Sequence, residues 1–339
     1  MKRHPLWSII LVGMIWMIIQ PASALAAEPV KIRIGQTQGV VSIDTPIFFM
    51  KPEILKHYGK SYMPEFIEFR ATSAEIPAFA AKELDFGFMS TAAMTSAILN
   101  ANLDLKIVMD MAADGAPGGW SNQWMVLEES PIKTVKDLKG KTIGSLAYGS
   151  GNDVALRVIL SKHGLDPKKD VNIVEVALPN MEPMLRQKKI DCALLLPDFY
   201  YPAIKKEGLR SLFQNREGMG FWQVLFLVGR TEFLKKYPEV TKDFLQDSLI
   251  GLRFIMDPKN RSGLLEWLAK WSKKPVSVFE DWAFIDGKES YRDPDGVPNI
   301  ESMQQDVDRM VEWKFLPKRI EIKQYVDLGY LNEARKRIK

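Results

Sequence analysis

Short runs of hydroxyl, amide and glycine residues follow several apolar segments of this chain, where they are suited to bind a small polar molecule. Hydroxyl and amide groups offer both donors and acceptors, and glycine allows the backbone to approach a ligand closely. Several of these runs precede helical patterns, and the N-terminus of a helix carries partial positive charge that favours anions. The residues that we predict on this basis to contact a ligand are Thr37, Gln38, Ser90, Thr91, Tyr148, Gly149, Ser150 and Asn152.

A further candidate group lies at residues 70–75, where Arg70 precedes a Thr72-x-x-Glu75 spacing. This spacing is typical of a capping box, in which the two side chains satisfy free N–H groups at the start of a helix. Arg70 would offer a two-pronged guanidinium to a carboxylate or sulfonate. A surface arginine beside an ordinary helix cap is the alternative interpretation. We include Arg70 and Thr72 among the candidate ligand-binding residues.

Acidic, aromatic and amide side chains near other predicted strand ends complete the candidate set. Asp198 would pair with an amine or accept a hydrogen bond from a heterocyclic N–H, and Tyr200 is able to stack on a planar ring. Asn122, Trp124 and Trp222 lie in or beside strands predicted to link two halves of the chain, where tryptophan packs in a core or forms the wall of a pocket. The charge of the ligand stays open between an oxyanion and a nitrogen-bearing group.

Catalytic, metal and nucleotide chemistry find little support in the sequence. Cys192 is the only cysteine, and the histidines beyond the N-terminal segment are His57 and His163, without the spacing of a zinc site. The Gly144-x4-Gly149 spacing resembles a phosphate loop, but Ser150-Gly151 stands where Lys followed by Ser or Thr is required. We expect no enzyme activity, no cofactor and no bound metal. The scattered basic residues indicate no nucleic-acid partner.

Residues 1–26 have the pattern of a cleavable secretory signal. Lys2 and Arg3 form a positive start, residues 6–19 are a nearly unbroken apolar run, and Ala24-Leu25-Ala26 fits the small-x-small rule for a cleavage site. The apolar run is shorter than the roughly 20 residues of a membrane span, although a retained N-terminal anchor is the alternative. No cysteine follows the signal to carry a lipid, and a single cysteine forms no internal disulfide. We therefore expect a protein that is free in the periplasm.

The elements that must position the candidate residues repeat one plan twice. Strand patterns at residues 31–35 and 83–90 are about 50 residues apart, and so are those at residues 141–146 and 189–195. Helical patterns lie between them, and such alternation predicts parallel strands with crossover helices. We therefore predict an α/β protein with two mixed, mostly parallel sheets that are flanked by helices.

Two further strand patterns, at residues 124–127 and 222–228, are predicted to cross between two lobes as a two-strand hinge. The 313 residues that follow the predicted signal are typical of two lobes rather than of one core. The predicted lobes are residues 28–126 with 226–339, and residues 127–225. Because ligands of such sheets bind beyond the carboxyl ends of the strands, we expect the candidate residues to meet in a cleft between the lobes.

Several motifs together carry a resemblance to a known family. The run SPIKTVKDLKGKTIG at residues 130–144 is similar to the DLKGK crossover of periplasmic solute-binding proteins. Lys82-Glu83-Leu84-Asp85 and Lys189-Ile190-Asp191-Cys192-Ala193 resemble the G-x-x-D-A steps of that family, although Glu83 and Lys189 replace its usual glycine. The run YVDLGYL at residues 325–331 is similar to its C-terminal signature. In order and spacing, the chain resembles the nitrate/sulfonate/taurine group and its thiamine-pyrimidine relatives, the NMT1/THI5-like set.

The resemblance implies a type II periplasmic binding-protein fold, in which two lobes close on a small solute and deliver it to the permease of an ABC importer. It also implies a monomer. An organic anion such as a sulfonate or carboxylate is the solute that we expect, with a thiamine-precursor-type pyrimidine or another aromatic heterocycle as the alternative. A pyrimidine-synthase-like enzyme is a further alternative, although the histidine and cysteine motifs of those enzymes are missing. A sensor that passes its closed form to a membrane receptor is not distinguished by sequence.

Overall fold

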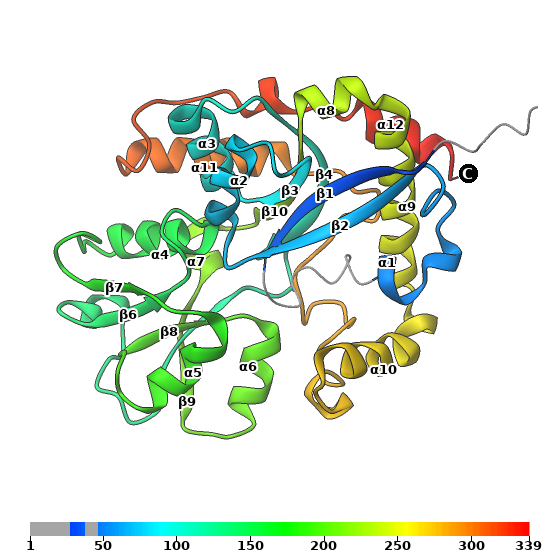
Figure 1. The fold of residues 1–339 in the computed structure, drawn as a ribbon. Helices are drawn as coiled ribbons and strands as arrows, with labels where there is room; N and C mark the ends of the chain where they lie inside the picture. The colour runs from blue at the N-terminus through cyan, green and yellow to red at the C-terminus, as the bar shows by residue number, and fades with distance from the viewer. Residues whose placement is uncertain (1–27, 38–46, 339) are drawn as a thin grey trace, which may run out of the picture.

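The frame of the molecule is a pair of five-stranded sheets (Figure 1). The computed structural model describes residues 28–37 and 47–338, so the predicted signal segment 1–26 and the candidate Gln38 lie outside the described residues. The first sheet has the strand order β2-β1-β3-β10-β4, and the second has the order β7-β6-β8-β5-β9. The strands are β1 (Val30–Thr37), β2 (Tyr62–Phe69), β3 (Phe86–Met89), β4 (Leu105–Asp114), β5 (Gln123–Leu127), β6 (Thr142–Ser145), β7 (Asn172–Glu175), β8 (Cys192–Leu195), β9 (Leu209–Gln214) and β10 (Trp222–Arg230).

Both sheets are built to the same plan. In the first sheet β1 pairs in parallel with β2 and β3, whereas β10 runs antiparallel between β3 and β4. In the second sheet β6 pairs in parallel with β7 and β8, whereas β5 runs antiparallel between β8 and β9. Four of the five strands in each sheet therefore run the same way. The prediction of two mixed, mostly parallel sheets is confirmed.

The segments that connect the two sheets differ from the hinge suggested by the sequence. β5 pairs only within the second sheet, and β10 pairs only within the first. The chain therefore passes between the sheets at residues 115–122 and 215–221, outside these two strands. The apolar pattern of the sequence predicted where both strands lie. It did not indicate which strands of which sheet would pair with them. We propose these two segments as the lobe boundaries, because boundaries at residues 126 and 226 would cut β5 and β10.

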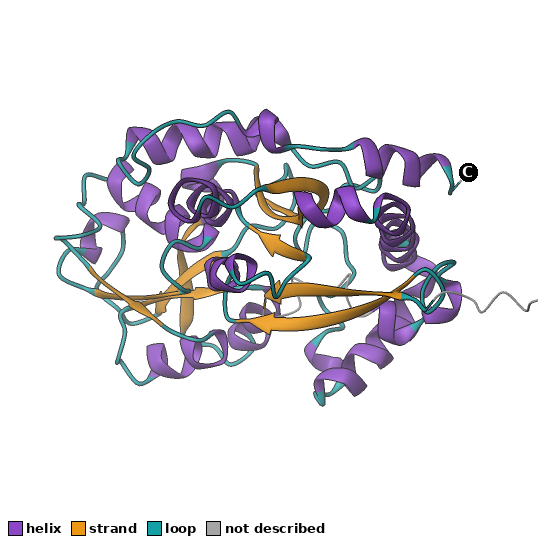
Figure 2. Cartoon of the chain, turned by 45° about the horizontal axis from the view of Figure 1, so that its top comes forward, coloured by secondary structure: helices purple, strands orange, loops and turns teal. Residues whose placement is uncertain are grey.

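Helices lie on both sides of the strands (Figures 1 and 2). Within residues 28–37 and 47–338, no helix is both long enough and apolar enough to cross a membrane. The helices are α1 (Ile47–Met50), α2 (Ile76–Ala80), α3 (Thr91–Ala101), α4 (Gly151–Lys162), α5 (Leu178–Arg186), α6 (Pro197–Ile204), α7 (Asn215–Met219), α8 (Thr231–Lys236), α9 (Pro238–Met256), α10 (Arg261–Ser272), α11 (Ile300–Glu312) and α12 (Gly329–Lys336).

Each sheet has its own hydrophobic core, and helix α4 contributes to both. The first core surrounds the first sheet and includes Val154 and Val158 of α4. The second core surrounds the second sheet and includes Leu156 and Leu160 of the same helix. Because residues two positions apart point to different faces of a helix, one helix is able to fill both cores. α4 thus holds the two halves of the molecule together beside the crossing segments.

Candidate functional site

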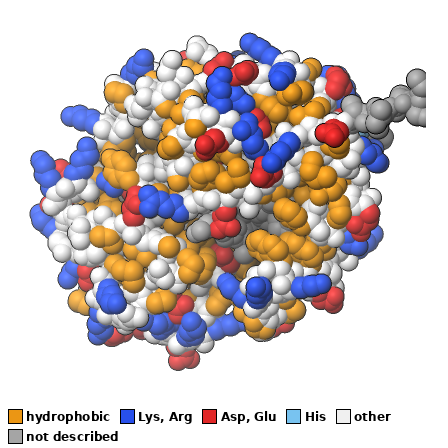
Figure 3. Space-filling view, viewed as in Figure 1, with side chains coloured by type: hydrophobic (Ala, Val, Ile, Leu, Met, Phe, Trp, Pro, Cys, Tyr) orange, Lys and Arg blue, Asp and Glu red, His pale blue; other side chains and the backbone are white. Residues whose placement is uncertain are grey.

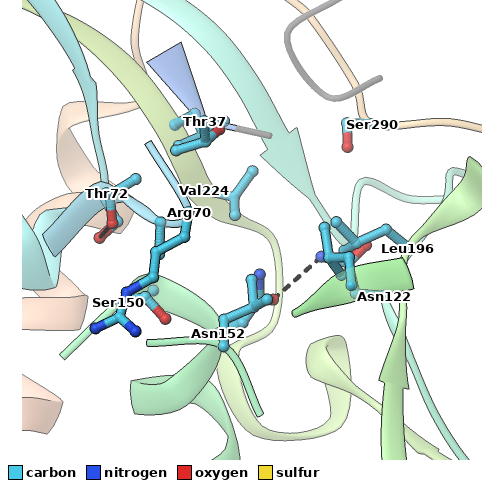
Figure 4. A pocket seen from close by; sticks show the side chains of 15 residues that line it. Thr37, Arg70, Thr72, Asn122, Ser150, Asn152, Leu196, Val224 and Ser290 are labelled. Atoms are coloured by element: carbon cyan, nitrogen blue, oxygen red, sulfur yellow. Dashed lines mark hydrogen bonds between the residues drawn. The ribbon is translucent and has the colours of Figure 1, made fainter. Parts of the chain in front are cut away.

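A cleft lies where the carboxyl ends of the parallel strands in the two sheets face each other. Its empty volume is about 520 Å³, which includes space open to solvent. A hollow is visible between the upper and lower parts of the molecule in Figure 3, and Figure 4 shows the lining side chains. The described residues that line the cleft are Thr37, Arg70, Ala71, Thr72, Ser90, Asn122, Leu146, Ser150, Gly151, Asn152, Leu178, Leu196, Val224, Leu225 and Ser290.

Two helix N-termini converge on this cleft, one from each half of the molecule. Ser90 is the N-cap of α3, and its Oγ accepts a hydrogen bond from the Ala93 N–H at 3.2 Å. Ser150 is the N-cap of α4, and its Oγ accepts from the Asp153 N–H at 3.4 Å. A Cβ added at Gly151 would lie 3.0 Å from the Ser90 Cβ, so the two helix starts are nearly in contact. Both ends carry partial positive charge, which suits an anion.

Arg70 lines the cleft, but its charge is already paired. Its Nη1 lies 3.0 Å from Oε2 of Glu175, at the end of β7 in the second sheet. The other carboxylate oxygen of Glu175 accepts from the Tyr148 N–H at 2.6 Å, and the Ser73 Oγ donates to the Tyr148 carbonyl at 2.9 Å. These contacts join the loop after β2 to the second sheet at one edge of the cleft.

The predicted capping box at Thr72 and Glu75 is wrong. Residues Thr72–Glu75 form a short 3-10 helix without a side-chain cap. The Thr72 Oγ1 instead lies 3.1 Å from the Ser90 Oγ, inside the cleft. The Glu75 carboxyl turns under the first sheet, where a Cβ added at Gly35 would lie 2.7 Å from its Oε2. Complete burial raises the pKa of Glu75 well above its usual value, and a backbone hydrogen bond at Phe88 offsets only part of this effect.

Three candidates that follow strands in sequence are not among the described residues that line the cleft. The Tyr148 ring is 66% exposed and lies 4.7 Å from the Arg157 guanidinium. Gly149 has a φ of +75° and its N–H donates to Asp153. The backbone conformation of this turn therefore accounts for a glycine at this position. Thr91 is buried, with its hydroxyl directed at Asp306 over 3.5 Å. A residue that follows a strand lies in a loop near the cleft, but its place in the sequence does not determine which way its side chain points.

Four other candidates pack around the cleft without lining it. Trp124 is fully buried in the second core, and Trp222 is buried beside Gly151, where an added Cβ would lie 3.3 Å from the indole ring. Asp198 is buried in the first turn of α6, and the Tyr200 ring packs against Trp120 with 5.0 Å between ring centroids. These side chains support the walls of the site.

Sequence reasoning missed the apolar part of the lining. Leu178, Leu196, Val224 and Leu225 border the cleft, but apolar residues at strand and helix ends look like core residues in a sequence. Ser290 was also missed, because it comes from the long segment between α10 and α11, which carries no strand-end signal. The cleft therefore combines a polar set of donors with an apolar wall.

Charge is sparse among the residues that the structure describes in this site. Arg70 is the one ionisable side chain among the described lining residues. Within residues 28–37 and 47–338, no group of three or more His, Cys, Asp or Glu side chains is placed to hold a metal ion. In the described part of the cleft, the recognition elements are thus hydroxyl groups, amides and helix N-termini, with one arginine at the edge.

Two sheets of the same design, each with one antiparallel strand among parallel ones and with a cleft at the facing strand ends, define the fold of periplasmic binding proteins. The alkanesulfonate-binding protein SsuA from Xanthomonas axonopodis pv. citri, in a structure bound to MOPS, matches with a TM-score of 0.71 and 21% identity over 89% of this chain and 99% of its own. SsuA from Escherichia coli matches with a TM-score of 0.67 and 21% identity over 90% and 99%. The periplasmic nitrate-binding protein NrtA from Synechocystis PCC 6803 matches with a TM-score of 0.73 and 12% identity over 92% and 90%.

The sequence model described as NMT1/THI5 like matches residues 65–261, which is more than half of the chain. The protein therefore belongs to the NMT1/THI5-like family. No curated protein shows a comparable sequence match.

Proposed function

We propose that this protein captures a small organic anion, such as a sulfonate or carboxylate, between its two lobes and delivers it to an ABC importer. The observation that carries this proposal is the meeting of the α3 and α4 N-termini at Ser90 and Ser150. One helix packs in the first core and the other begins beside the second sheet. An anion that touches both helix starts would therefore bind best when the lobes are together.

The apolar wall supports an organic solute over a small inorganic ion. Leu178, Leu196, Val224 and Leu225 would cover the carbon part of the solute while the anionic group meets the helix ends. A micromolar solute needs about 8 kcal/mol of binding free energy. A few charge-assisted hydrogen bonds and the burial of alkyl surface supply energies of that order.

The alternative solute, an aromatic heterocycle, has weaker support. Its predicted partners were Asp198 and Tyr200, and both pack behind the cleft. The described lining contains no acidic side chain. A cationic or N–H-rich ring would therefore meet mostly hydrogen-bond donors of the protein, which do not pair with its own N–H groups. Enzymatic turnover has no group of catalytic side chains to support it in the described cleft.

Calorimetric titration of the purified protein with MOPS, methanesulfonate and benzoate tests the proposal. We expect at least one of these anions to bind and to raise the melting temperature, because a ligand that binds only the folded state stabilises it. Native mass spectrometry of protein purified from its host would reveal a retained solute. If none of the anions binds while a cationic amine or heterocycle does, the proposed solute class is wrong.

A further inference from the structure

Five buried side chains form a chain of hydrogen bonds that ends in the cleft, and we call it the amide relay. The Trp120 Nε1–H donates to Asn122 Oδ1 at 2.9 Å, and Asn122 Nδ2 donates to Asn152 Oδ1 at 3.2 Å. From the other side, the Trp124 Nε1–H donates to Asn215 Oδ1 at 2.8 Å, and Asn215 Nδ2 donates to Asn152 Oδ1 at 2.7 Å. Both arms of the amide relay therefore end on one oxygen, that of Asn152.

The direction of each hydrogen bond in the amide relay is fixed by the indole groups, because an indole N–H donates and never accepts. Trp120 must therefore meet the oxygen of Asn122, which leaves the Asn122 nitrogen to face Asn152. In the same way Trp124 fixes the oxygen of Asn215 toward itself. A reversed Asn152 amide would place its nitrogen against two other donors, and buried donors without acceptors are costly.

A carboxyl group supports the same orientation at Asn215. Asp114 lies against the Asn215 side chain, in a contact that favours the charged form of the carboxyl, and its oxygens accept from the Ser121 Oγ at 2.5 Å and the Asn122 backbone N–H at 2.9 Å. Asp114 acts as an acceptor in these contacts, so the Asn215 nitrogen faces it. The oxygen of Asn215 is then left for Trp124, as the relay requires.

We infer that two tryptophan N–H groups, acting through the amide relay, force Asn152 to present its N–H group rather than its carbonyl to the solute. Asn152 lines the cleft as the second residue of α4. Figure 4 shows its side-chain nitrogen pointing toward Val224 and the middle of the cleft, while its oxygen faces Asn122. The Asn152 N–H therefore adds a fixed donor beside the positive end of α4.

This inference rests on the proposed function and deepens it, because it assigns Asn152 as a specificity-determining residue. Trp120, Trp124 and Asn215 are positioning residues that act on the solute through Asn152. A fixed donor favours acceptor-rich groups such as sulfonate and carboxylate, and it disfavours ammonium groups. An amide that rotates freely would bind both anionic and ammonium groups, by turning either its nitrogen or its oxygen to the solute. The amide relay fixes one orientation and so makes Asn152 selective for anionic groups.

The orientation of Asn152 is measurable without any solute. In protein labelled with ¹⁵N-asparagine, the Asn152 amide signals are assigned by their loss in Asn152→Asp. We expect fast exchange of these amide protons with water, because they face the cleft. Slow exchange, with protons as protected as those of Asn215, would overturn the inference whether or not any anion binds.

The contribution to binding is tested with Asn152→Asp in a titration with MOPS. Aspartate keeps an oxygen that accepts from Asn122 and Asn215, so we expect the fold to be retained. It replaces the donor in the cleft by a second carboxylate oxygen, and we expect MOPS affinity to fall at least about tenfold, the range of one charge-assisted hydrogen bond. Asn332→Asp, an exposed position on α12, makes the same charge change far from the cleft and should bind MOPS like the wild type.

Trp120→Phe and Trp124→Phe remove one fixing donor each and keep an aromatic ring. We expect a lower preference for MOPS over the cationic probe ethanolamine, together with slower exchange of the Asn152 amide protons as its orientation is no longer fixed. An unchanged preference and unchanged exchange in both variants would overturn the positioning role. If wild-type protein binds no anion at all, the proposed function fails, and the exchange measurements alone still decide the orientation of the relay.

Discussion

At Gly151 the lack of a side chain sets how closely the two helix N-termini approach. A Cβ at this position would lie 3.0 Å from the Ser90 Cβ and 3.3 Å from the Trp222 ring, and both distances are shorter than ordinary van der Waals contact. We predict that Gly151→Ala forces the helix starts apart and weakens MOPS binding by roughly tenfold, measured by calorimetry.

Gly263 provides the matched control for that substitution. It lies within α10, where an added Cβ would meet nothing within 4 Å. Gly263→Ala should therefore raise the free energy of unfolding by about 0.5–1 kcal/mol, because alanine favours the helix, and leave MOPS binding unchanged. Equal effects of both substitutions on binding would contradict the role assigned to Gly151.

The pairing of Arg70 with Glu175 makes a second prediction at the residue scale. Glu175→Gln removes the carboxylate charge, while the new side-chain oxygen still accepts from the Tyr148 N–H. Arg70 would then be free to meet an anion, and we predict that MOPS affinity increases by roughly three- to tenfold at low salt.

The side chains of this ion pair are 66% and 42% exposed, so the gain should shrink as salt screens the charges. Glu266→Gln, an exposed position on α10, makes the same charge change away from the cleft and serves as the control. A fall in affinity for Glu175→Gln would mean that the pair holds the lobes together and does not compete with the solute.

Among the elements, α11 supports α3 through a buried acid. Asp306 of α11 lies behind Thr91, the first residue of α3, and its Oδ1 accepts a hydrogen bond from the Arg309 Nη1 at 2.9 Å. Burial raises the pKa of Asp306 to about 8, and the contacts with Arg309 and Thr91 offset only part of this effect. In the unfolded chain the pKa returns to the ordinary value of 3.8, so folding takes up a proton at pH values between these limits.

The sign of this pH dependence is fixed by the raised pKa. The contribution of Asp306 to stability is fully present below about pH 4 and is lost as the pH rises through about 8. We predict that Asp306→Asn gains stability relative to the wild type as the pH rises from 5 to 9, measured by urea unfolding at each pH. A difference in unfolding free energy that is constant across this range would contradict burial of a protonated Asp306.

For the whole molecule, we expect cooperative unfolding because α4 packs in both hydrophobic cores. Leu156 packs in the second core and Val158 in the first, and both side chains are fully buried. Loss of either core would expose half of α4, so we expect a single transition in scanning calorimetry. Leu156→Ala should destabilise the protein by about 2–5 kcal/mol and lower this one transition.

Val158→Ala, on the other face of the helix, should lower the same transition. If the thermogram shows two transitions and each substitution moves only one of them, the two halves unfold independently and α4 does not couple them.

The sequence alone determined the kind of fold and where its polar loops lie. Strand patterns repeated at about equal spacing predicted two similar sheets, because backbone periodicity is a local property. Hydroxyl and amide residues at strand ends predicted part of the cleft lining, since parallel strands bring their carboxyl ends to one edge. The candidates that the structure places along the cleft are Thr37, Arg70, Thr72, Ser90, Asn122, Ser150 and Asn152.

Only the tertiary structure decided which sheet β5 and β10 each complete and which way each side chain turns. β5 and β10 have apolar patterns that suit either sheet, and their partners lie far away in the sequence. The sequence spacing predicted Glu75 as part of a helix cap. Its carboxyl group instead lies under the sheet, in the space left by the missing side chains of Gly35 and Gly87. The sense of the Asn152 amide depends on two indoles that are not its neighbours in sequence, because hydrogen bonding between distant side chains is set by packing and not by local spacing.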